Sequence, residues 1–336
     1  MKYLIPDRHS FRANLHCHTT CSDGQYSPQE IKDLYRSLGI SIVAFSDHRN
    51  LVDQSSLSDD SFLALNAFEY DVPAFEQHSP WFWNTLIHIG MIARSPETRL
   101  EKPIAIEPPD TFPGSSVFEQ KRNYLIASVN AAVRQARAQN FLCILNHPEW
   151  SFLSVGDALE FQGLLGVEVY NHASSVNTGI REGDAFYNQW VSELVRTHAP
   201  HPFPFAIATD DNHARNPVGY RDCNNGGGWL ELFSNDLTYP SVVSAIETGS
   251  FYASSGATIK SLEYDPDNRM VHVRCSPAAV IRIFSRGRVS KYLAAEPGCA
   301  IEEATFHLDP QSFHSFFRIR IEGIDGKEAW SNCYPI

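Results

Sequence analysis

Two histidines one residue apart, His16 and His18, are followed five residues later by Asp23 near the start of the sequence. In an extended strand, residues i and i+2 point to the same face, so both imidazoles would project into one space. Imidazole and carboxylate together form a ligand set for Zn, Mn or Fe. A lone pair of this kind is more often solvated or structural, so a metal site needs further ligands elsewhere in the chain.

Apolar runs that contain or end in a histidine or an acid recur along the sequence. They span residues 40–48, 86–89, 141–148, 164–171 and 205–213. Core histidines have no reason to collect at strand ends, so the position of these residues is more informative than their type. The candidate metal ligands collected in this way are His16, His18, Asp23, His48, Glu69, His88, His147, Asp211 and His213.

Helical segments separate the apolar runs. Ser27 and Glu30 match a capping box, and Gly39 suits the C′ position at the end of the same helix. Apolar residues at helical spacing predict two more helices, at 124–140 and 184–197. Strands that alternate with helices predict an α/β fold with a parallel sheet. In a barrel of such units the active site lies at the C-terminal ends of the strands.

The pattern changes near residue 250, where helical periodicity stops. Short alternating runs follow, and turn sequences lie between them; such runs are typical of antiparallel strands with one solvated face. The runs are 271–275, 279–284, 304–308 and 316–321. We therefore expect an α/β domain at 1–255 and a small β-sandwich-like domain at 256–336.

Composition excludes several classes of protein. The chain has 336 residues, 43% of them hydrophobic, and a formal net charge of −12. That charge argues against a nucleic-acid partner or an anionic membrane surface, because both require clustered Lys and Arg. Seven irregularly spaced cysteines do not indicate a disulfide framework. No secretory n-region and no membrane-length apolar run is present, so a cytoplasmic location is expected, and the oligomeric state stays open.

Several short motifs in a fixed order resemble those of the polymerase and histidinol phosphatase (PHP) metallohydrolase family. They are NLHCHTTCSDG at 14–24, FSDH at 45–48, AFEY at 67–70, IHIG at 87–90, NHP at 146–148 and D-x-H at 211–213. The resemblance covers about residues 12–255. GSFYASSG at 249–256 and DGKEAWSN at 325–332 are similar to two-domain members, including the branch that contains carbaryl hydrolase.

The resemblance implies a distorted (β/α)7 barrel that holds two to three divalent metal ions, Zn, Mn or Fe. It assigns His16, His18, Glu69 and Asp211 to the first metal, Glu69 with His88 and His147 to the second, and Asp23, His48 and His213 to the third. Two alternatives stay open, because Asp210 competes with Asp211 and His78 competes with His88.

The chemistry implied by the resemblance follows from charge. Two adjacent metals lower the pKa of a shared water toward neutrality, and the resulting hydroxide is the nucleophile without a dedicated protein base. Three divalent ions against three carboxylates leave the site at about +3, which suits an anionic small-molecule substrate such as a phosphate ester. Guanidinium groups bind phosphate bidentately. Candidate substrate-binding residues are Arg215, Arg49, Arg181, Asn171 and His172.

The sequence thus predicts a metal-dependent phosphoesterase of small molecules. A carbamate, ester or amide hydrolase with the same metal site is one alternative, and a non-catalytic binding module stabilised by metals is another. Other hydrolase classes are not supported, because the sequence contains neither a G-x-S-x-G elbow nor a P-loop.

Overall fold

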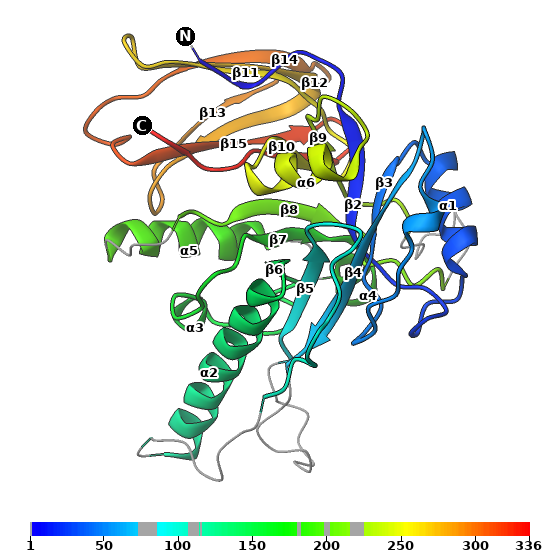
Figure 1. The fold of residues 1–336 in the computed structure, drawn as a ribbon. Helices are drawn as coiled ribbons and strands as arrows, with labels where there is room; N and C mark the ends of the chain where they lie inside the picture. Colours follow the sequence, from blue (N-terminus) through cyan, green and yellow to red (C-terminus); the bar gives the residue numbers. More distant parts are fainter. Residues whose placement is uncertain are drawn as a thin grey trace.

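The structure is a computed structural model that describes residues 2–72, 86–106, 114, 116–179, 183–197, 202–215 and 225–336. In these ranges the chain forms a mixed α/β fold with a large sheet of 17 strands and six α-helices (Figure 1). The helices are α1 (Pro28–Ser37), α2 (Val117–Ala138), α3 (Val155–Ala158), α4 (His172–Thr178), α5 (Asp184–Arg196) and α6 (Tyr239–Glu247). A short 3-10 helix, η1, spans Ser55–Leu57.

The first helix forms as its sequence predicts. The Ser27 hydroxyl accepts a hydrogen bond from the backbone N–H of Glu30, and the Glu30 carboxylate accepts one from the backbone N–H of Ser27 at 2.8 Å. The capping box is therefore confirmed. Gly39, with φ of +75°, occupies the left-handed conformation that ends a helix without steric cost.

Seven strands form the part of the sheet that carries the predicted ligands. They are β2 (Phe11–Cys17), β3 (Ile42–Phe45), β4 (Leu63–Asp71), β5 (His88–Ala93), β6 (Phe141–Leu145), β7 (Gly166–Asn171) and β8 (Phe205–Thr209). β2, β3 and β4 pair in parallel, and so do β6, β7 and β8. β5 is antiparallel to both β4 and β6, so the expectation of a parallel sheet is wrong at this strand.

The reversed direction of β5 matters for the ligands. His88 is the first residue of β5, and the antiparallel register places it opposite Asp71 at the end of β4. A histidine at the start of this strand therefore reaches the same sheet edge as residues at the ends of its neighbours. Beyond β8, Cys17 and Asn212 form an isolated parallel bridge, and the His18 N–H donates to the Asn212 carbonyl at 2.8 Å.

The remaining strands all pair antiparallel with their neighbours. They are β1 (Lys2–Ile5), β9 (Trp229–Leu232), β10 (Phe251–Ser254), β11 (Ile259–Asp265), β12 (Met270–Phe284), β13 (Ser290–Ala294), β14 (Ile301–His307), β15 (Phe316–Gly323), β16 (Glu328–Trp330) and β17 (Tyr334–Pro335). The runs 271–275 and 279–284, expected as two strands, form the single strand β12. β12 changes partner from β11 to β15 next to Pro277, which has no N–H to donate to a ladder.

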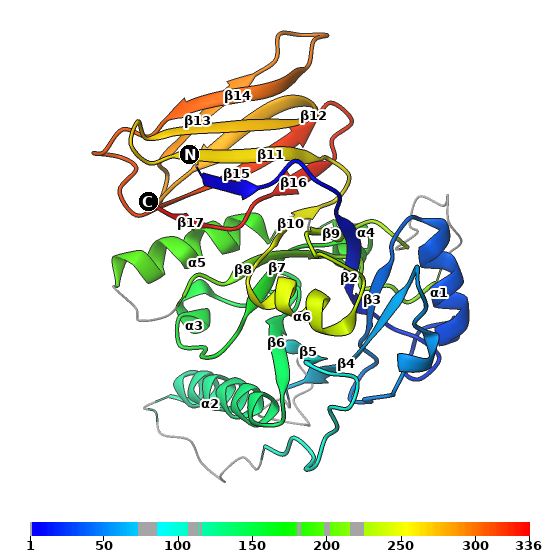
Figure 2. The same ribbon diagram turned by 45° about the horizontal axis from the view of Figure 1, so that its top comes forward.

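Three hydrophobic clusters underlie these strands in the described part of the chain. The first packs α2, α3, α5 and α6 against β2–β8, the second lies among the C-terminal strands and includes Ile5 of β1, and a smaller third packs α1 against β2–β4. β1 pairs with β11, so both chain termini lie at the C-terminal strands (Figure 2). β10 pairs with both β9 and β16 and links the two parts of the sheet. The predicted division after residue 255 stays a prediction.

No helix in the part of the chain that the structure describes is long and apolar enough to cross a membrane.

Candidate metal centre

The structure brings all nine predicted metal ligands together at one edge of the sheet. They come from the ends of β2, β4, β6 and β8, from the start of β5, and from the segments that follow β2 and β3. Their contacts divide them into three groups that share residues. We call them the inner group (His16, His18, Glu69 and Asp211), the lateral group (Glu69, His88 and His147) and the outer group (His18, Asp23, His48 and His213).

The inner group has the spacing of a ligand set. His16 Nε2 lies 3.1 Å from His18 Nε2, 3.2 Å from Glu69 Oε1 and 3.1 Å from Asp211 Oδ1. His18 Nε2 lies 3.2 Å from Asp211 Oδ1 and 3.4 Å from Glu69 Oε2. Ligand atoms about 2.0–2.2 Å from a tetrahedral ion lie about 3.3–3.6 Å from one another. His16, His18 and Glu69 therefore meet the spacing of a possible cation site, and Asp211 Oδ1 lies within 3.2 Å of both histidines.

Glu69 connects the inner group to the lateral group. Its Oε1 atom lies 3.2 Å from His88 Nδ1 and 3.5 Å from His147 Nε2. The Asn146 amide donates to the same oxygen at 2.7 Å. Glu69 Oε2 lies 3.2 Å from His48 Nδ1, so this single buried carboxylate meets histidines of all three groups.

The outer group surrounds the carboxylate of Asp23. The distances are 3.4 Å to His213 Nε2, 3.7 Å to His18 Nδ1 and 3.9 Å to His48 Nε2. His18 Nδ1 is buried and has no hydrogen-bond partner among the described residues. His18 thus presents one ring nitrogen to the inner group and the other to the outer group. A donor atom that is buried without a hydrogen bond fits a cation ligand.

The charges of the inner group reinforce one another. Burial opposes ionisation of Glu69, but His16 and His88 outweigh it and hold the pKa of Glu69 well below its usual range. Burial also lowers the pKa of His16, but Asp211 and Glu69 outweigh it and raise that pKa well above its usual value. The carboxylates that attract protons to these rings would attract a divalent cation in the same way.

Glu168 of β7 belongs to the site although the sequence prediction omitted it. Its Oε1 atom lies 2.8 Å from His16 Nδ1, and its Oε2 atom accepts the backbone N–H of His147 at 2.8 Å. With Nδ1 donating to Glu168, His16 keeps the Nε2 lone pair for the inner group. Such carboxylate–histidine pairs orient metal ligands in proteins. The available signal was a lone acid inside the apolar run 164–169.

Asp71 is the second omitted residue. It stands two residues after Glu69 in β4, and its Oδ1 atom lies 2.8 Å from His48 Nδ1. Its Oδ2 atom lies 2.8 Å from Arg49 Nε. His48, Glu69, Asp71 and His88 also meet the spacing of a possible cation site. The sequence signal for Asp71 was the pattern Glu-x-Asp. As in His-x-His, residues i and i+2 of a strand point to the same face.

The structure separates the roles of Asp210 and Asp211. Asp210 accepts hydrogen bonds from Tyr35 Oη at 2.7 Å, from Asn14 Nδ2 at 2.6 Å and from the Gly226 N–H at 2.6 Å. Burial raises the pKa of Asp210 to about 7 despite these bonds. Asp211, by contrast, faces both histidines of the inner group. Asp211 is therefore the acid that the D-x-H motif places in the site.

The backbone is strained at three residues of the site. His147, Asp211 and Arg49 have φ angles of 25°, 51° and 52°. A non-glycine residue in this region costs on the order of 1–3 kcal/mol, and such residues cluster at functional sites. The His147 side chain is nevertheless held in place, since its Nδ1 atom lies 3.3 Å from Ser151 Oγ.

The predicted substrate residues have different surroundings. Arg215 lines the cavity at the site, with its Nη2 atom 3.7 Å from Asp23 Oδ2. Arg49 is exposed and pairs with Asp71. The Asn171 amide group donates to Glu168 at 2.9 Å and to Asp211 at 3.2 Å, while its oxygen accepts the Ser174 N–H.

These contacts bear on the role expected of Asn171. Both amide hydrogens and the oxygen of Asn171 therefore have partners within the protein, and its role in substrate binding stays a prediction. The His172 ring lies 2.7 Å from Tyr170 Oη and is not among the described residues that line the cavity. Arg181 and His78, a substrate candidate and a ligand candidate, lie outside the described residues.

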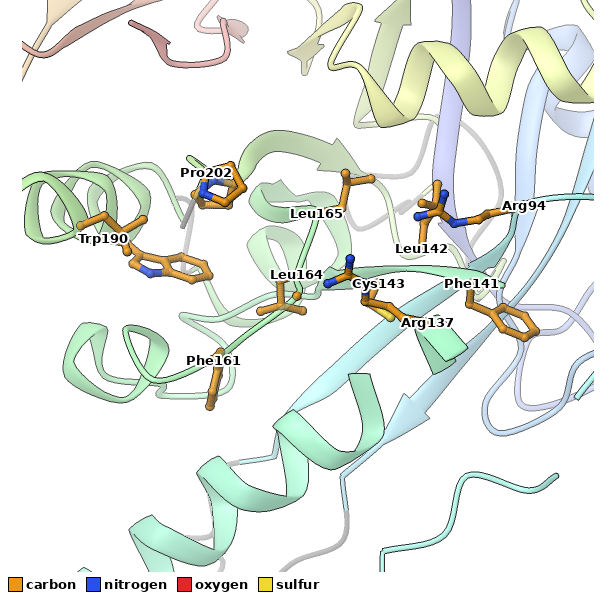
Figure 3. Close-up of a pocket in the computed structure, with 13 residues that line it drawn as sticks. Arg94, Arg137, Phe141, Leu142, Cys143, Phe161, Leu164, Leu165, Trp190 and Pro202 are labelled. Carbon is orange, nitrogen blue, oxygen red and sulfur yellow. The ribbon is translucent and has the colours of Figure 1, made fainter. Parts of the chain in front are cut away.

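A cavity of about 180 Å³ lies over the three groups. Trp150 forms an apolar wall, with its ring 4.8 Å from that of His147 and 5.9 Å from that of His88. A larger cavity of about 290 Å³ lies at the opposite ends of β6, β7 and β8 (Figure 3). Apolar side chains and two arginines, Arg94 and Arg137, line it, and no candidate metal-ligand group does among the described residues.

Comparisons with known proteins give structural neighbours only. No family model matches the sequence, and no curated protein matches it. A two-domain protein from Bacteroides vulgatus that contains a predicted PHP-like metal-dependent phosphoesterase is 12% identical at a TM-score of 0.46; the match covers 100% of this chain and 98% of that chain.

An amidohydrolase from Chromobacterium violaceum, solved with sulfate and no metal, is 17% identical at a TM-score of 0.39; the match covers 61% of this chain and 88% of that chain. At such low identities and TM-scores, neither likeness establishes the family or the activity of this chain.

Proposed function

We propose that this chain is a metal-dependent hydrolase that cleaves phosphate esters of small molecules. The observation that carries the proposal is the inner group, in which the Nε2 atoms of His16 and His18 lie 3.1 Å apart and each lies 3.1–3.4 Å from a carboxylate oxygen of Glu69 and of Asp211. Without a cation, this arrangement would bury two acids and two histidines for no gain in packing.

Two to three divalent cations, Zn, Mn or Fe, would be held by the inner, lateral and outer groups. Glu69 would be shared by the inner and lateral groups, and His18 by the inner and outer groups. Bound there, the cations would supply Lewis-acid activation of water and of the scissile ester. Imidazole with carboxylate does not select among these metals.

The side chains around the cations have roles that follow from their contacts. Glu168 orients the ring of His16 through its Nδ1 atom. It also accepts the backbone N–H of His147 and so holds the backbone at this member of the lateral group. Asn146 orients Glu69. Trp150 excludes water from one wall of the cavity. Each of these contacts removes freedom from a ligand before substrate binds, which lowers the cost of organising the site.

Two arginines at the rim support an anionic substrate. Arg215 lines the cavity, and Arg49, the residue after His48, is exposed and pairs with Asp71 beside the outer group. The cavity of about 180 Å³ is smaller than the roughly 300–1,000 Å³ of most ligand pockets. It therefore suits the head group of a substrate whose remaining part lies outside.

We also propose that the chain has the architecture implied by the motifs, a distorted barrel with a separate C-terminal domain. The bridge between Cys17 and Asn212 supports a closed arrangement of β2–β8, a distorted barrel of seven strands. The second hydrophobic cluster supports the C-terminal strands as a separate domain beside it.

An activity screen tests the function. The purified chain, loaded in turn with Zn, Mn and Fe(II), would be offered p-nitrophenyl phosphate, bis-p-nitrophenyl phosphate and 1-naphthyl methylcarbamate. We expect phosphate-ester turnover that a chelator removes and that His147→Ala and Asp211→Ala variants lack. Phosphate-ester turnover at background together with rapid carbamate cleavage would contradict the substrate class. No turnover of any substrate by the metal-loaded chain would contradict the hydrolase.

A further inference from the structure

The Asp71 carboxylate lies between two histidines of the metal centre and the guanidinium group of Arg49. Its Oδ1 atom lies 2.8 Å from His48 Nδ1 and 3.7 Å from His88 Nε2, while its Oδ2 atom lies 2.8 Å from Arg49 Nε. The Arg49 Nη2 group also donates to the Asp71 backbone carbonyl at 3.4 Å. The Asp71 side chain is 24% exposed, so it lies where the buried site meets the rim.

The contact with His48 has the geometry of the contact between Glu168 and His16. In both pairs a carboxylate oxygen lies 2.8 Å from Nδ1 of a histidine, and the other ring nitrogen faces a ligand group. For His48 that other nitrogen is Nε2, which lies 3.9 Å from Asp23 Oδ1. If Nδ1 carries the proton, Nε2 has its lone pair free for the outer group.

His48 needs such a partner more than His213 does. His213 Nδ1 lies 2.8 Å from the Asp211 carbonyl, which can only accept a hydrogen bond, so the backbone alone favours the Nδ1–H tautomer. The acceptors at His48 Nδ1 are both carboxylates, Asp71 at 2.8 Å and Glu69 at 3.2 Å. Glu69 is shared with the inner and lateral groups, so we assign the His48 Nδ1 proton to Asp71 Oδ1, the nearer of the two acceptors.

We propose that Asp71 is a positioning residue that holds His48 in the Nδ1–H tautomer and so directs His48 Nε2 to a cation in the outer group. The same carboxylate holds Arg49 at the rim, so one side chain places both a ligand and a candidate phosphate contact. This inference rests on the proposed function. The inference is incompatible with a second arrangement, in which Asp71 and His48 Nδ1 bind a cation directly together with Glu69 and His88.

The tautomer of His48 tests the inference. Zinc-loaded wild-type protein labelled with ¹⁵N-histidine would be studied by long-range ¹H–¹⁵N NMR, with the His48 signals assigned from a His48→Gln variant. We expect a protonated Nδ1 and a zinc-bound Nε2. A zinc-bound Nδ1 with a protonated Nε2 would overturn the inference, because His48 would then bind on the side of Asp71.

Three variants separate positioning from packing. Asp71→Leu removes the acceptor at similar volume, and we expect the weakest-bound zinc equivalent to lose affinity by about 10- to 100-fold. Asp71→Asn keeps an acceptor oxygen and should lose less. Arg49→Gln removes only the ion pair and should leave both the tautomer and the zinc stoichiometry unchanged.

Zinc titrations against a chromophoric chelator would give the affinities, and the stoichiometry would come from elemental analysis of dialysed protein. Wild-type zinc affinity in Asp71→Leu would overturn the inference. If Asp71→Leu does not fold, the wild-type tautomer and the Asp71→Asn affinity still decide it. No zinc uptake by the wild type would instead contradict the proposed function.

Discussion

The inner and outer groups contain the same kinds of side chain in different surroundings. His16 and Glu69 of the inner group have side chains that are 1% exposed, and Glu168 beside them is 0% exposed. In the outer group, the Asp23 side chain is 47% exposed and that of His48 is 27% exposed. The inner carboxylates meet histidines and amides, whereas the outer group also contacts Arg215 through Asp23 and Arg49 through Asp71.

The difference indicates two levels of preorganisation. A cation in the inner group would meet ligands whose rotamers are already fixed by burial and by hydrogen bonds. A cation in the outer group would meet partly solvated ligands that compete with arginines and water. The inner position should therefore bind its cation more tightly, and the outer position should respond more to substrate and to salt.

Removing the carboxylate shared between the groups should have the largest effect. Glu69 lies within 3.5 Å of a ring nitrogen in each of five histidines. We expect Glu69→Gln to lower kcat by at least about 1,000-fold, because electrostatic stabilisation at the centre is lost. Initial rates with p-nitrophenyl phosphate, beside elemental analysis, measure this. Glu303→Gln, the same change at an exposed glutamate of β14, is the matched control.

Acid should weaken cation binding in the inner and lateral groups. Burial lowers the pKa of His16 and of His147, but the neighbouring carboxylates outweigh it and raise both values above the usual one. Below the raised pKa the rings hold protons that a cation must displace, so cation affinity should fall as the pH falls. From pH 8 to pH 6 we expect a loss of about 100-fold or more, measured by competition with a chelator. An affinity that does not change over this range would contradict the account.

Loss of Glu168, the buried partner of His16, should weaken cation binding more than loss of Asp23, the exposed acid of the outer group. We expect Glu168→Gln to weaken the tightest-bound cation by about 10- to 100-fold. Asp23→Asn should weaken only the weakest-bound cation, by about 10-fold, because solvent screens this acid. Stepwise metal titrations of both variants measure the two effects. Equal losses at the same cation would remove the distinction between the groups.

The smallest effect is expected at the rim. Arg215→Gln should raise KM for p-nitrophenyl phosphate by about 3- to 10-fold with little change in kcat, because a solvated guanidinium contributes modestly to binding an anion. Added salt should reduce the difference between the variant and the wild type. A large loss of kcat with unchanged KM would instead place Arg215 closer to the reacting atoms.

Much of the site could be predicted because its ligands carry local signals. His-x-His, Asp-His and D-x-H each place polar side chains at the end of an apolar run, and the structure brings all nine predicted residues together. His88 reached the site for a reason that the sequence did not contain. It begins its strand, and only the antiparallel direction of β5 carries it to the same edge.

The omitted residues lack such signals. Glu168 is one acid in a buried strand, and its role depends on a contact with a histidine 152 residues away. In the sequence, Asp71 is an ordinary acid at the end of a strand. Its contact with His48 exists only because the fold places β4 beside the segment after β3. Asp210 shows the opposite case, since its type suits a metal site but its carboxylate accepts hydrogen bonds from Tyr35 and Asn14. Long-range pairing of this kind is not encoded in spacing.

The central claim is that a divalent cation occupies the inner group. A crystal of the zinc- or manganese-loaded protein, with data collected on both sides of the metal absorption edge, tests it directly. We predict an anomalous peak bonded to His16 Nε2, His18 Nε2, Glu69 and Asp211. A metal-loaded crystal whose anomalous map shows no peak among these four residues would contradict the account.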